Sequence, residues 1–385
     1  MKKKIVCFLL ILLVLSTFAF KPQTKNAFAQ DFNAKAYLLV DYNTNTVLLN
    51  KNETEHLEVA SMVKLMTSLI TIEKIQAGEL SLDQKVMVSE YAASMEGSQA
   101  FLDANHEYKV EDLLKSVIVA SANDSSVVLA EAISGSEDNF VVLMNEKAKE
   151  LGMNDTLYSN ATGLEHGTQY SCAKDIAKLL KEEIKHKLYF NYSKIWMDEI
   201  VHDSGRKTEL VNTNILTRKY SGCDIGKTGF TDEAGYCLSA SAQKNNMRLI
   251  SVVIGAKSTK DRFDISSSLL NYGFANYENK LVLDSSKPIE NKIKIKNAKE
   301  NEIEISYKEN FYYLSKKGEK NEFKFKYELP TNLKAPLKQN QKIGKVYVVL
   351  DGTVVGEVDI VSSKDYNKMT YKDNLNKVID NYSLI

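Results

Sequence analysis

The sequence predicts an α+β fold, in which helices cluster on an antiparallel sheet and a small all-β domain follows. Three observations predict it. Strand patterns occur early, in Ala36 to Asn52, and return as three runs between residues 225 and 256. Helical periodicity fills the interval, mainly in residues 61–78 and 110–152. Beyond Tyr277, short alternating segments replace this mixture, as expected for a separate β-domain.

Residues 1–29 have the composition of a secretory signal peptide. MKKK precedes the apolar run Ile5 to Phe20, and Ala27-Phe28-Ala29 offers a small-residue cleavage pattern before Gln30. The leader holds five lysines and no acids, so its removal from a chain of 50 basic and 50 acidic residues leaves a net charge of −5. We therefore expect a secreted, extracytoplasmic protein that does not bind nucleic acid.

The first elements of the expected catalytic domain, residues 30–277, are a hairpin and a helix. AYLLVDYNTNTVLLNKN alternates around a turn at residues 43–46, which predicts the hairpin. A helix is predicted from Ser61, and Gly78 supplies its stop. Its apolar residues have helical spacing: Met62, Leu65, Met66, Leu69 and Ile72.

The later part of this domain is predicted to return to the sheet. IGKTGF, YCLSASAQ and LISVVIGA read as strands, and SSSLLNYGFANY reads as a closing helix that ends near Tyr277. The first two strands flank the polar turn TDEAG and form a hairpin. Within it, Lys227 stands on a half-buried strand, where an unpaired charge is costly.

A β-sandwich-like domain is predicted over residues 278–363. Its strands are expected at KIKIK (292–296), EIEIS (302–306), EFKFKYEL (322–329), KVYVVL (345–350) and VVGEVDIV (354–361). A tail of residues 364–385 follows, and five of its apolar side chains fall on one helical face: Tyr371, Leu375, Val378, Ile379 and Tyr382. Two interpretations of this tail stay open. One is a peripheral membrane contact, which is weak because the positive and negative charges of the tail balance, and the other is a short helix packed on the β-domain.

Neither a disulfide framework nor a metal site is expected. Outside the leader the chain holds three cysteines, and a hairpin centred on TDEAG places Cys223 and Cys237 out of register, which favours free thiols. The five histidines show no HExxH or other close metal spacing. We predict no metal and no cofactor.

Three short motifs carry the candidate chemistry. Ser61-Met62-Val63-Lys64 is an SxxK at the start of an apolar helix. Ser121-Ala122-Asn123 is an SxN between two helical stretches, and Lys227-Thr228-Gly229 is a KTG on a strand. Each alone has an ordinary structural explanation, such as helix capping or a turn. Their occurrence together, in this order and on these elements, favours a shared active site.

The spacing suits a serine nucleophile. A serine hydroxyl needs a base within hydrogen-bond reach, and residues three apart on a helix share a face, so Lys64 can activate Ser61. Burial and a second cation lower the pKa of a lysine, and Lys227 can supply that cation while facing an anionic ligand and solvent only in part. Ser121 is expected to relay a proton to the leaving group, and Asn123 to hold a substrate amide.

The strand at Lys227 to Phe230 is expected to bind substrate. Its backbone groups can pair with an extended peptide, as in other cases of strand addition. Thr228 and Phe230 lie on this strand, and Gly229 leaves room for the peptide to approach.

Longer stretches around the motifs resemble the low-molecular-mass penicillin-binding proteins that are serine-type D-alanyl-D-alanine carboxypeptidases. They are ASMVKLMT, SVIVASANDSSVVLAEAISGS, MNEKAKELGMNDTLYSNATGL, IGKTGFTDEAGYCLSASA, and LISVVIGA followed by Arg262. The resemblance is dense over residues 34–277 and extends to the β-domain only by pattern. The SxN has Ala122 where this family commonly has glycine.

The resemblance implies a penicillin-binding/β-lactamase-like catalytic domain that removes the terminal D-Ala from peptidoglycan pentapeptide stems. By similarity, Ser61 forms the acyl-enzyme, Lys64 is the base, and Lys227 binds the substrate carboxylate. The backbone N–H groups of Ser61 and Phe230 would form the oxyanion hole. β-Lactam antibiotics would be covalent inhibitors, and the protein would be associated with the cell wall or the outer face of the membrane.

Two alternatives remain at this point. A class A-like β-lactamase shares the motifs but needs a general base for fast deacylation, and Glu165 lies in the right interval. A catalytically silent wall-binding protein could keep the fold, although the intact Ser61, Lys64, Ser121 and Lys227 argue against it.

Overall fold

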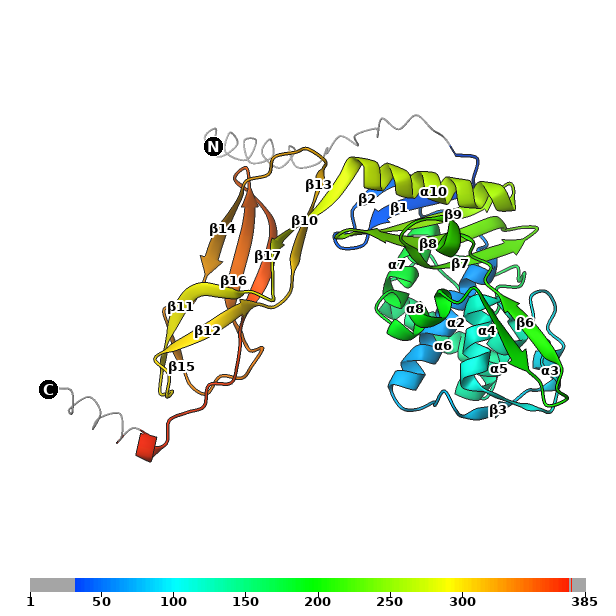
Figure 1. Ribbon diagram of the computed structural model, residues 1–385, viewed down its shortest axis with the longest axis horizontal. Coiled ribbons are helices and arrows are strands. Elements are labelled where there is room, and N and C mark those ends of the chain that lie inside the picture. Colours follow the sequence, from blue (N-terminus) through cyan, green and yellow to red (C-terminus); the bar gives the residue numbers. More distant parts are fainter. Residues whose placement is uncertain (1–31, 374, 376–385) are drawn as a thin grey trace, which may run out of the picture. The chain divides into compact units, whose positions relative to one another are not determined.

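The computed structural model of the protein describes residues 32–373 and 375. Its central feature is a five-stranded antiparallel sheet (Figure 1). In spatial order the strands are β2 (Val47–Lys51), β1 (Ala36–Asp41), β9 (Met247–Ala256), β8 (Gly235–Lys244) and β7 (Cys223–Thr231). All ten residues of β9 are buried, because this central strand has helices over both faces of the sheet.

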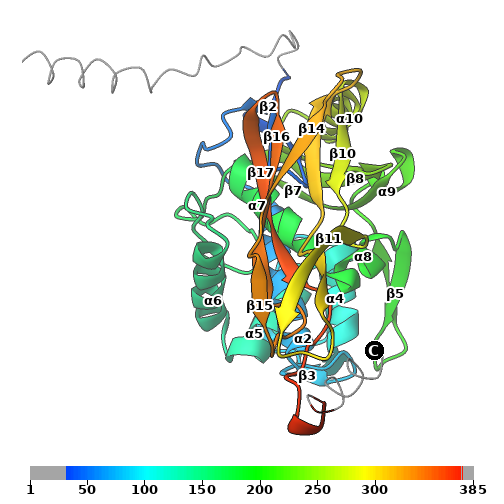
Figure 2. The ribbon, with the colours of Figure 1, turned by 90° about the vertical axis from the view of Figure 1, so that its left-hand side faces the viewer.

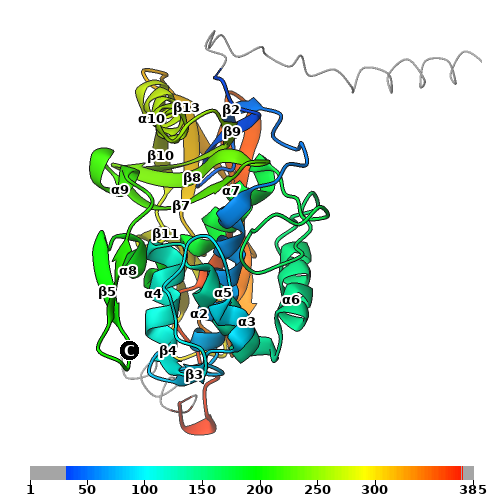
Figure 3. The same cartoon turned by 90° about the vertical axis from the view of Figure 1, so that its right-hand side faces the viewer.

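Helices cover the two faces unequally. The long α10 (Thr259–Asn276) lies along one face, whereas the other helices gather on the opposite side (Figures 1 and 3). These are α2 (Lys64–Gln76), α4 (Val110–Val119), α5 (Asn123–Ser134), α6 (Glu137–Glu150), α7 (Ala173–Glu183) and α8 (Lys187–Ser193). Shorter pieces are the 3₁₀ helix η1 (Ala60–Val63), α3 (Glu90–Ala93) and α9 (Leu216–Lys219).

The helix α2 lies at the centre of this layer and positions the site. Its residues Lys64 to Ile72 are all buried, so the helix is enclosed on every side except near its C-terminal end. Such a helix is stabilised by burial within a surrounding layer more than by one amphipathic face. It stops at Gln76, and Gly78 adopts φ +75° just beyond, a conformation that glycine accepts without steric cost.

The structure confirms the predicted elements of this domain. The hairpin at Ala36 to Asn52, the helices within residues 61–77 and 110–150 and the three late strands are all present. The closing helix begins seven residues earlier than expected, with Ser258 as its N-cap. Sequence analysis assigned no element between residues 153 and 222, where α7, α8 and α9 occur.

Two small hairpins were also not predicted. They pair β3 (Lys85–Met87) with β4 (Glu107–Lys109), and β5 (Met197–Val201) with β6 (Lys207–Val211). The turn between β5 and β6 spans residues 202–206. Strands this short carry only two or three alternations, which is too little to separate them from loop by pattern alone.

The C-terminal region forms a six-stranded sheet of its own (Figure 2). In spatial order it contains β14 (Phe323–Glu328), β16 (Lys342–Leu350), β17 (Thr353–Ser362), β12 (Glu302–Tyr307), β11 (Pro288–Lys296) and β15 (Asn332–Lys334). A separate two-stranded sheet pairs β10 (Tyr277–Leu283) with β13 (Phe311–Lys316). All five predicted strands are confirmed, and their buried residues, including Ile295, Ile305, Val346, Val348 and Ile360, form a core separate from that around α2.

Two predictions fall wholly or mostly on the ends of the chain, outside the described residues. The expected leader, residues 1–29, lies outside the described residues, as does most of the apolar face of the tail. Of that face, Tyr371 and Leu375 are described, and both are exposed. Among the described residues, no helix is both long enough and apolar enough to cross a membrane.

Candidate active site

The structure brings the predicted nucleophile and base into contact. Ser61 lies in η1 and Lys64 is the first residue of α2. Lys64 Nζ donates a hydrogen bond to Ser61 Oγ over 2.8 Å and another to the backbone oxygen of Thr162 over 2.5 Å. The three-residue spacing places both side chains on one face, as predicted. The hydrogen bond to the Thr162 carbonyl fixes the side-chain nitrogen of Lys64 beside the hydroxyl.

The environment of Lys64 favours its neutral form. The side chain is 1% exposed. Burial lowers the pKa of Lys64 well below its usual value, and the nearby charge of Lys227 lowers it further, against a smaller opposing effect from Asp124. A lysine with a depressed pKa can accept a proton near neutral pH, which is the property that a general base requires.

The second lysine contacts the SxN motif. Lys227 Nζ donates to Ser121 Oγ over 2.6 Å and to the backbone oxygen of Thr228 over 3.0 Å. Its side chain is 2% exposed, so the expected partial contact with solvent is absent. Burial, together with the charge of Arg262, lowers the pKa of Lys227 to about 7.

Asn123 presents an unused hydrogen-bond acceptor. It is the first residue of α5, and its backbone N–H donates to Ser98 O over 2.7 Å. Its side-chain Nδ2 donates to Glu96 O over 2.6 Å, whereas Oδ1 is buried and has no partner in the described part of the chain. A buried polar atom without a partner is costly, so this geometry suits an acceptor that meets an N–H of a ligand.

Two residues at the motifs have left-handed backbone conformations. Ala60, directly before the nucleophile, has φ +48°, and Ser121 has φ +66°. Such conformations in residues other than glycine cost about 1–3 kcal/mol and cluster at functional sites. Ala122 has an ordinary φ of −63°, which explains why alanine is accepted where the family commonly has glycine.

The KTG strand lies at the edge of the sheet. β7 is the last strand in the order and pairs only with β8 among the described strands of this sheet, so its outer edge offers backbone groups to an extended ligand. Phe230 is 48% exposed and packs against Tyr236 with the two rings tilted and their centroids 4.4 Å apart.

The lack of a side chain at Gly229 lets the segment that carries the nucleophile pack closely against β7. A Cβ placed on this residue would lie 2.7 Å from Val59 O and 3.1 Å from Ser61 N. The missing side chain therefore lets the Val59–Ser61 backbone pack against β7, whereas sequence analysis assigned that space to substrate. Strand β7 and the backbone N–H of Ser61 are held close together as a result.

Sequence analysis assigned no role to several residues that support the site. Thr162 supplies the carbonyl that holds Lys64, and Gly163 follows with φ +79° and a would-be Cβ only 2.1 Å from Ala60 O. Arg262 Nη1 donates to Gly229 O over 3.0 Å, and Thr213 contacts Thr228 through their hydroxyl oxygens at 2.7 Å. Among these supporting residues, the only local sequence signal is the glycine directly after Thr162 in SNATGL. The others come from distant elements.

The cysteines behave as the sequence predicts. Cys172, Cys223 and Cys237 are free and buried. In the β7–β8 register, Cys237 pairs with Gly229 and Cys223 with Ala242, so the two hairpin thiols are not opposite each other. Burial raises the pKa of all three thiols, which keeps them in the unreactive protonated form.

Comparison with known proteins agrees with this geometry. A family model described as D-alanyl-D-alanine carboxypeptidase matches residues 22–258, and one described as penicillin-binding protein 5, C-terminal domain, matches residues 277–380. The chain is 39% identical to the D-alanyl-D-alanine carboxypeptidase DacF of Bacillus subtilis over 371 residues, which is 95% of each chain.

Two solved structures extend the comparison. The structure of penicillin-binding protein 5 from Haemophilus influenzae has a TM-score of 0.73 and 32% identity, and the match covers 91% of this chain and 100% of that one. Penicillin-binding protein D2 from Listeria monocytogenes, in its ampicillin-bound form, has a TM-score of 0.55 and 30% identity, covering 64% and 98%. The chain therefore belongs to the D-alanyl-D-alanine carboxypeptidase family of penicillin-binding serine hydrolases, with a catalytic domain of that type followed by an all-β C-terminal domain.

Proposed function

We propose that the protein removes the terminal D-Ala from peptidoglycan pentapeptide stems through an acyl-enzyme on Ser61. One observation carries this proposal most directly. Ser61 Oγ lies 2.8 Å from the Nζ of Lys64, a buried lysine whose pKa is lowered well below its usual value. A nucleophile and a base within hydrogen-bond reach are the minimum that covalent acyl transfer needs.

The contact of Lys64 with Ser61 supports the following steps of acylation and hydrolysis. Neutral Lys64 accepts the proton of Ser61 Oγ while that oxygen attacks the carbonyl carbon of the penultimate D-Ala. The C–N bond to the terminal D-Ala then breaks, and the proton held by Lys64 returns to the departing nitrogen through Ser121 Oγ. Water hydrolyses the ester, which releases the shortened stem and restores the serine hydroxyl.

Three further groups are assigned to recognition. Lys227, with Thr228, meets the C-terminal carboxylate, which supplies an anion to this buried cation. The free Oδ1 of Asn123 accepts the amide N–H on the acyl side of the substrate. The backbone N–H groups of Ser61 and Phe230 stabilise the tetrahedral oxyanion.

β-Lactams are expected to acylate Ser61 as substrate mimics, and the ampicillin-bound Listeria relative supports this. A β-lactamase activity is not favoured. Glu165, the required general base of that alternative, is exposed, and its carboxylate accepts the backbone N–H of Glu233 over 3.3 Å. The catalytically silent alternative is not favoured either, since the nucleophile and base are in contact.

The direct test uses the purified mature protein and a peptide that ends in D-Ala-D-Ala. Release of free D-alanine by the unsubstituted protein, and none by Ser61→Ala with an unchanged melting temperature, is the expected result. D-Alanine release that survives in Ser61→Ala would refute the assignment of the nucleophile.

We also infer a division into a leader (1–29), a catalytic domain (30–277), a β-domain (278–363) and a tail (364–385). All motif residues precede Tyr277, and the two hydrophobic cores are separate. Residues 30–277 alone should then be acylated by penicillin at a rate close to that of the mature chain, well below the melting temperature. A folded but unreactive fragment would show that the β-domain contributes to the active site.

The leader supports secretion across the cytoplasmic membrane, and the substrate class then places the protein at the cell wall. The exposed Tyr371 and Leu375 support a peripheral membrane contact through the tail. Co-sedimentation with anionic vesicles tests this contact, and equal recovery of the mature chain with and without residues 364–385 would exclude it.

A further inference from the structure

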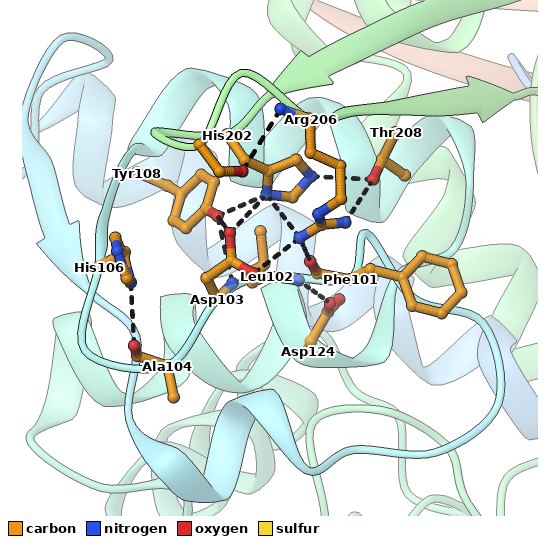
Figure 4. A network of polar contacts seen from close by, with 11 residues as sticks. Phe101, Leu102, Asp103, Ala104, His106, Tyr108, Asp124, His202, Arg206 and Thr208 are labelled. Atoms are coloured by element: carbon orange, nitrogen blue, oxygen red, sulfur yellow. Dashed lines mark hydrogen bonds and ion pairs between the residues drawn. The ribbon is translucent and has the colours of Figure 1, made fainter.

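A buried histidine lies at the turn between β5 and β6, outside the three motifs. The side chain of His202 is 0% exposed. Its Nδ1 lies 2.6 Å from the hydroxyl of Tyr108 and 3.1 Å from Nη2 of Arg206, and its Nε2 lies 2.9 Å from Oγ1 of Thr208 (Figure 4). A fully buried imidazole with partners on both nitrogens is held in one orientation.

These partners define its protonation state. Nδ1 faces two groups that can donate, the Tyr108 hydroxyl at 2.6 Å and Arg206 at 3.1 Å, and one that only accepts, Asp103 Oδ2 at 3.3 Å. The two shorter contacts assign Nδ1 as an acceptor, so the proton of the neutral ring resides on Nε2 and is donated to Thr208. Burial lowers the pKa of His202, and the positive charge of Arg206 lowers it further, whereas Asp103 and Asp124 oppose these effects. His202 is therefore a neutral acceptor at neutral pH.

The same turn holds a segment of the chain that is distant in sequence. Arg206 Nη2 donates to Phe101 O over 2.6 Å and to Asp103 Oδ1 over 2.8 Å. Phe101 has φ +56°, a costly conformation for a bulky residue that persists only when its surroundings hold it. His202 and Arg206 thus form a clamp on residues 96–103, which we call the 96–103 segment (Figure 4).

The segment reaches the active site at its other end. Asn123 donates its backbone N–H to Ser98 O and its side-chain Nδ2 to Glu96 O. These two bonds orient the amide so that Oδ1 remains the free acceptor. In between, the carboxylate of Asp124 accepts the backbone N–H groups of Ala100 and Leu102, over 3.0 and 3.1 Å.

We propose that His202 is a positioning residue: with Arg206 it fixes the 96–103 segment, which in turn aims the side-chain amide of Asn123 at the substrate. The inference rests on the proposed function for its kinetic consequence. Its structural part, the restraint of the segment by the clamp, is independent of activity.

The clamp also has a defined response to pH. Protonation at Nδ1 would remove the acceptor that Arg206 uses and place two cations side by side, so the clamp weakens as the pH falls below the ordinary histidine value of about 6.5. The charged or titratable groups that face His202 are Asp103 from the segment, Tyr108 from β4, Arg206 from its own turn and Asp124 from α5. Although desolvation opposes them, the hydrogen bond and charge of Arg206 lower the pKa of Asp103, so this carboxylate stays ionised in this range.

The test compares four variants of the mature chain with the unsubstituted protein. His202→Ala and Arg206→Gln break the clamp. His202→Gln is the conservative variant, because its amide can accept from Arg206, donate to Thr208 and never take up a proton. The matched control is His106→Gln, since the side chain of His106 is exposed and, within the described part of the chain, its ring hydrogen-bonds only to the backbone oxygen of Ala104.

Two measurements are made on each variant: the second-order rate of acylation by a fluorescent penicillin between pH 5.5 and 8, and backbone amide hydrogen exchange. His202→Ala and Arg206→Gln should acylate roughly tenfold more slowly at pH 8, the effect expected for one lost buried hydrogen bond to a charged group, and exchange should rise in residues 96–103. His202→Gln should keep the rate at pH 8 and lose less of it at pH 5.5 than the unsubstituted protein. His106→Gln should match the unsubstituted protein.

Several results would overturn the proposal. They are an unchanged acylation rate in His202→Ala, a slower rate without faster exchange in residues 96–103, or a His202→Gln variant as slow as His202→Ala. If the unsubstituted protein is not acylated at all, the proposed function fails, while the exchange measurement still decides whether the clamp restrains the segment.

Discussion

Substitution of Gly229 by alanine should impair acylation severely. The new Cβ would lie 2.7 Å from Val59 O, whereas ordinary contacts begin at 3.4 Å, so the two backbones must separate by about 0.7 Å. Ser61 N, at 3.1 Å from the same Cβ, would move with Val59. Displacements near 1 Å cost about 10²-fold in rate, and loss of one oxyanion-hole donor costs about 10²–10³-fold. We therefore expect acylation to fall by about 10²-fold.

The assay is the second-order rate of labelling by a fluorescent penicillin, measured beside the melting temperature. Gly167→Ala is the matched control, because Gly167 has no positive φ and a Cβ there would have no neighbour within 4 Å. That variant should acylate normally. A Gly229→Ala protein that is folded and labels within about threefold of the unsubstituted rate would refute the close packing of β7 on the Ser61 segment.

Three other predictions concern buried ionisable groups. Lys64→Arg should lose about 10²–10⁴-fold in acylation, because a guanidinium cannot accept a proton, and a near-normal rate would exclude Lys64 as the base. Lys227→Ala should weaken the binding of peptides with a free C-terminal carboxylate more than that of amidated peptides, and equal losses for both would contradict carboxylate binding. In the unsubstituted protein, KM for the free-carboxylate peptides should rise as the pH passes about 7 and Lys227 loses its proton. Glu183 is fully buried against Ser68, and burial raises its pKa well above 4.5, so the native state holds a proton that the unfolded state releases. Stability should therefore fall by about 1.4 kcal/mol per pH unit above 4.5 until the folded-state pKa is reached, and Glu183→Gln should remove that slope in thermal melts; an unchanged slope would contradict a buried neutral acid.

Much of the fold was predictable because its long elements have clear periods. The buried strand β9 is mostly apolar and α2 has apolar residues at helical spacing, so each is identified by a strong local signal. The strands β5 and β6 have only five residues each, and their pairing depends on the helical layer that they border. Short elements of this kind are decided by tertiary contacts more than by local pattern.

The site was predictable to the extent that its residues stand in motifs. The contacts of Lys64 with Ser61 and of Lys227 with Ser121 join residues whose spacing or order had a chemical reason. Thr162 contributes only a backbone carbonyl, which no side-chain pattern reveals. The burial of Lys227 was underestimated, because accessibility depends on the whole surrounding layer.

The most direct test of the central claim locates the covalent bond itself. The mature protein is trapped with penicillin, digested, and mapped by mass spectrometry, while a parallel sample is assayed for D-alanine release from a D-Ala-D-Ala peptide. The account predicts an adduct on the peptide that contains Ser61 and no adduct in Ser61→Ala. It also predicts that the protein releases D-alanine before treatment with penicillin and no longer does so afterwards. An adduct on another residue, or full D-alanine release from a stoichiometrically labelled protein, would contradict it.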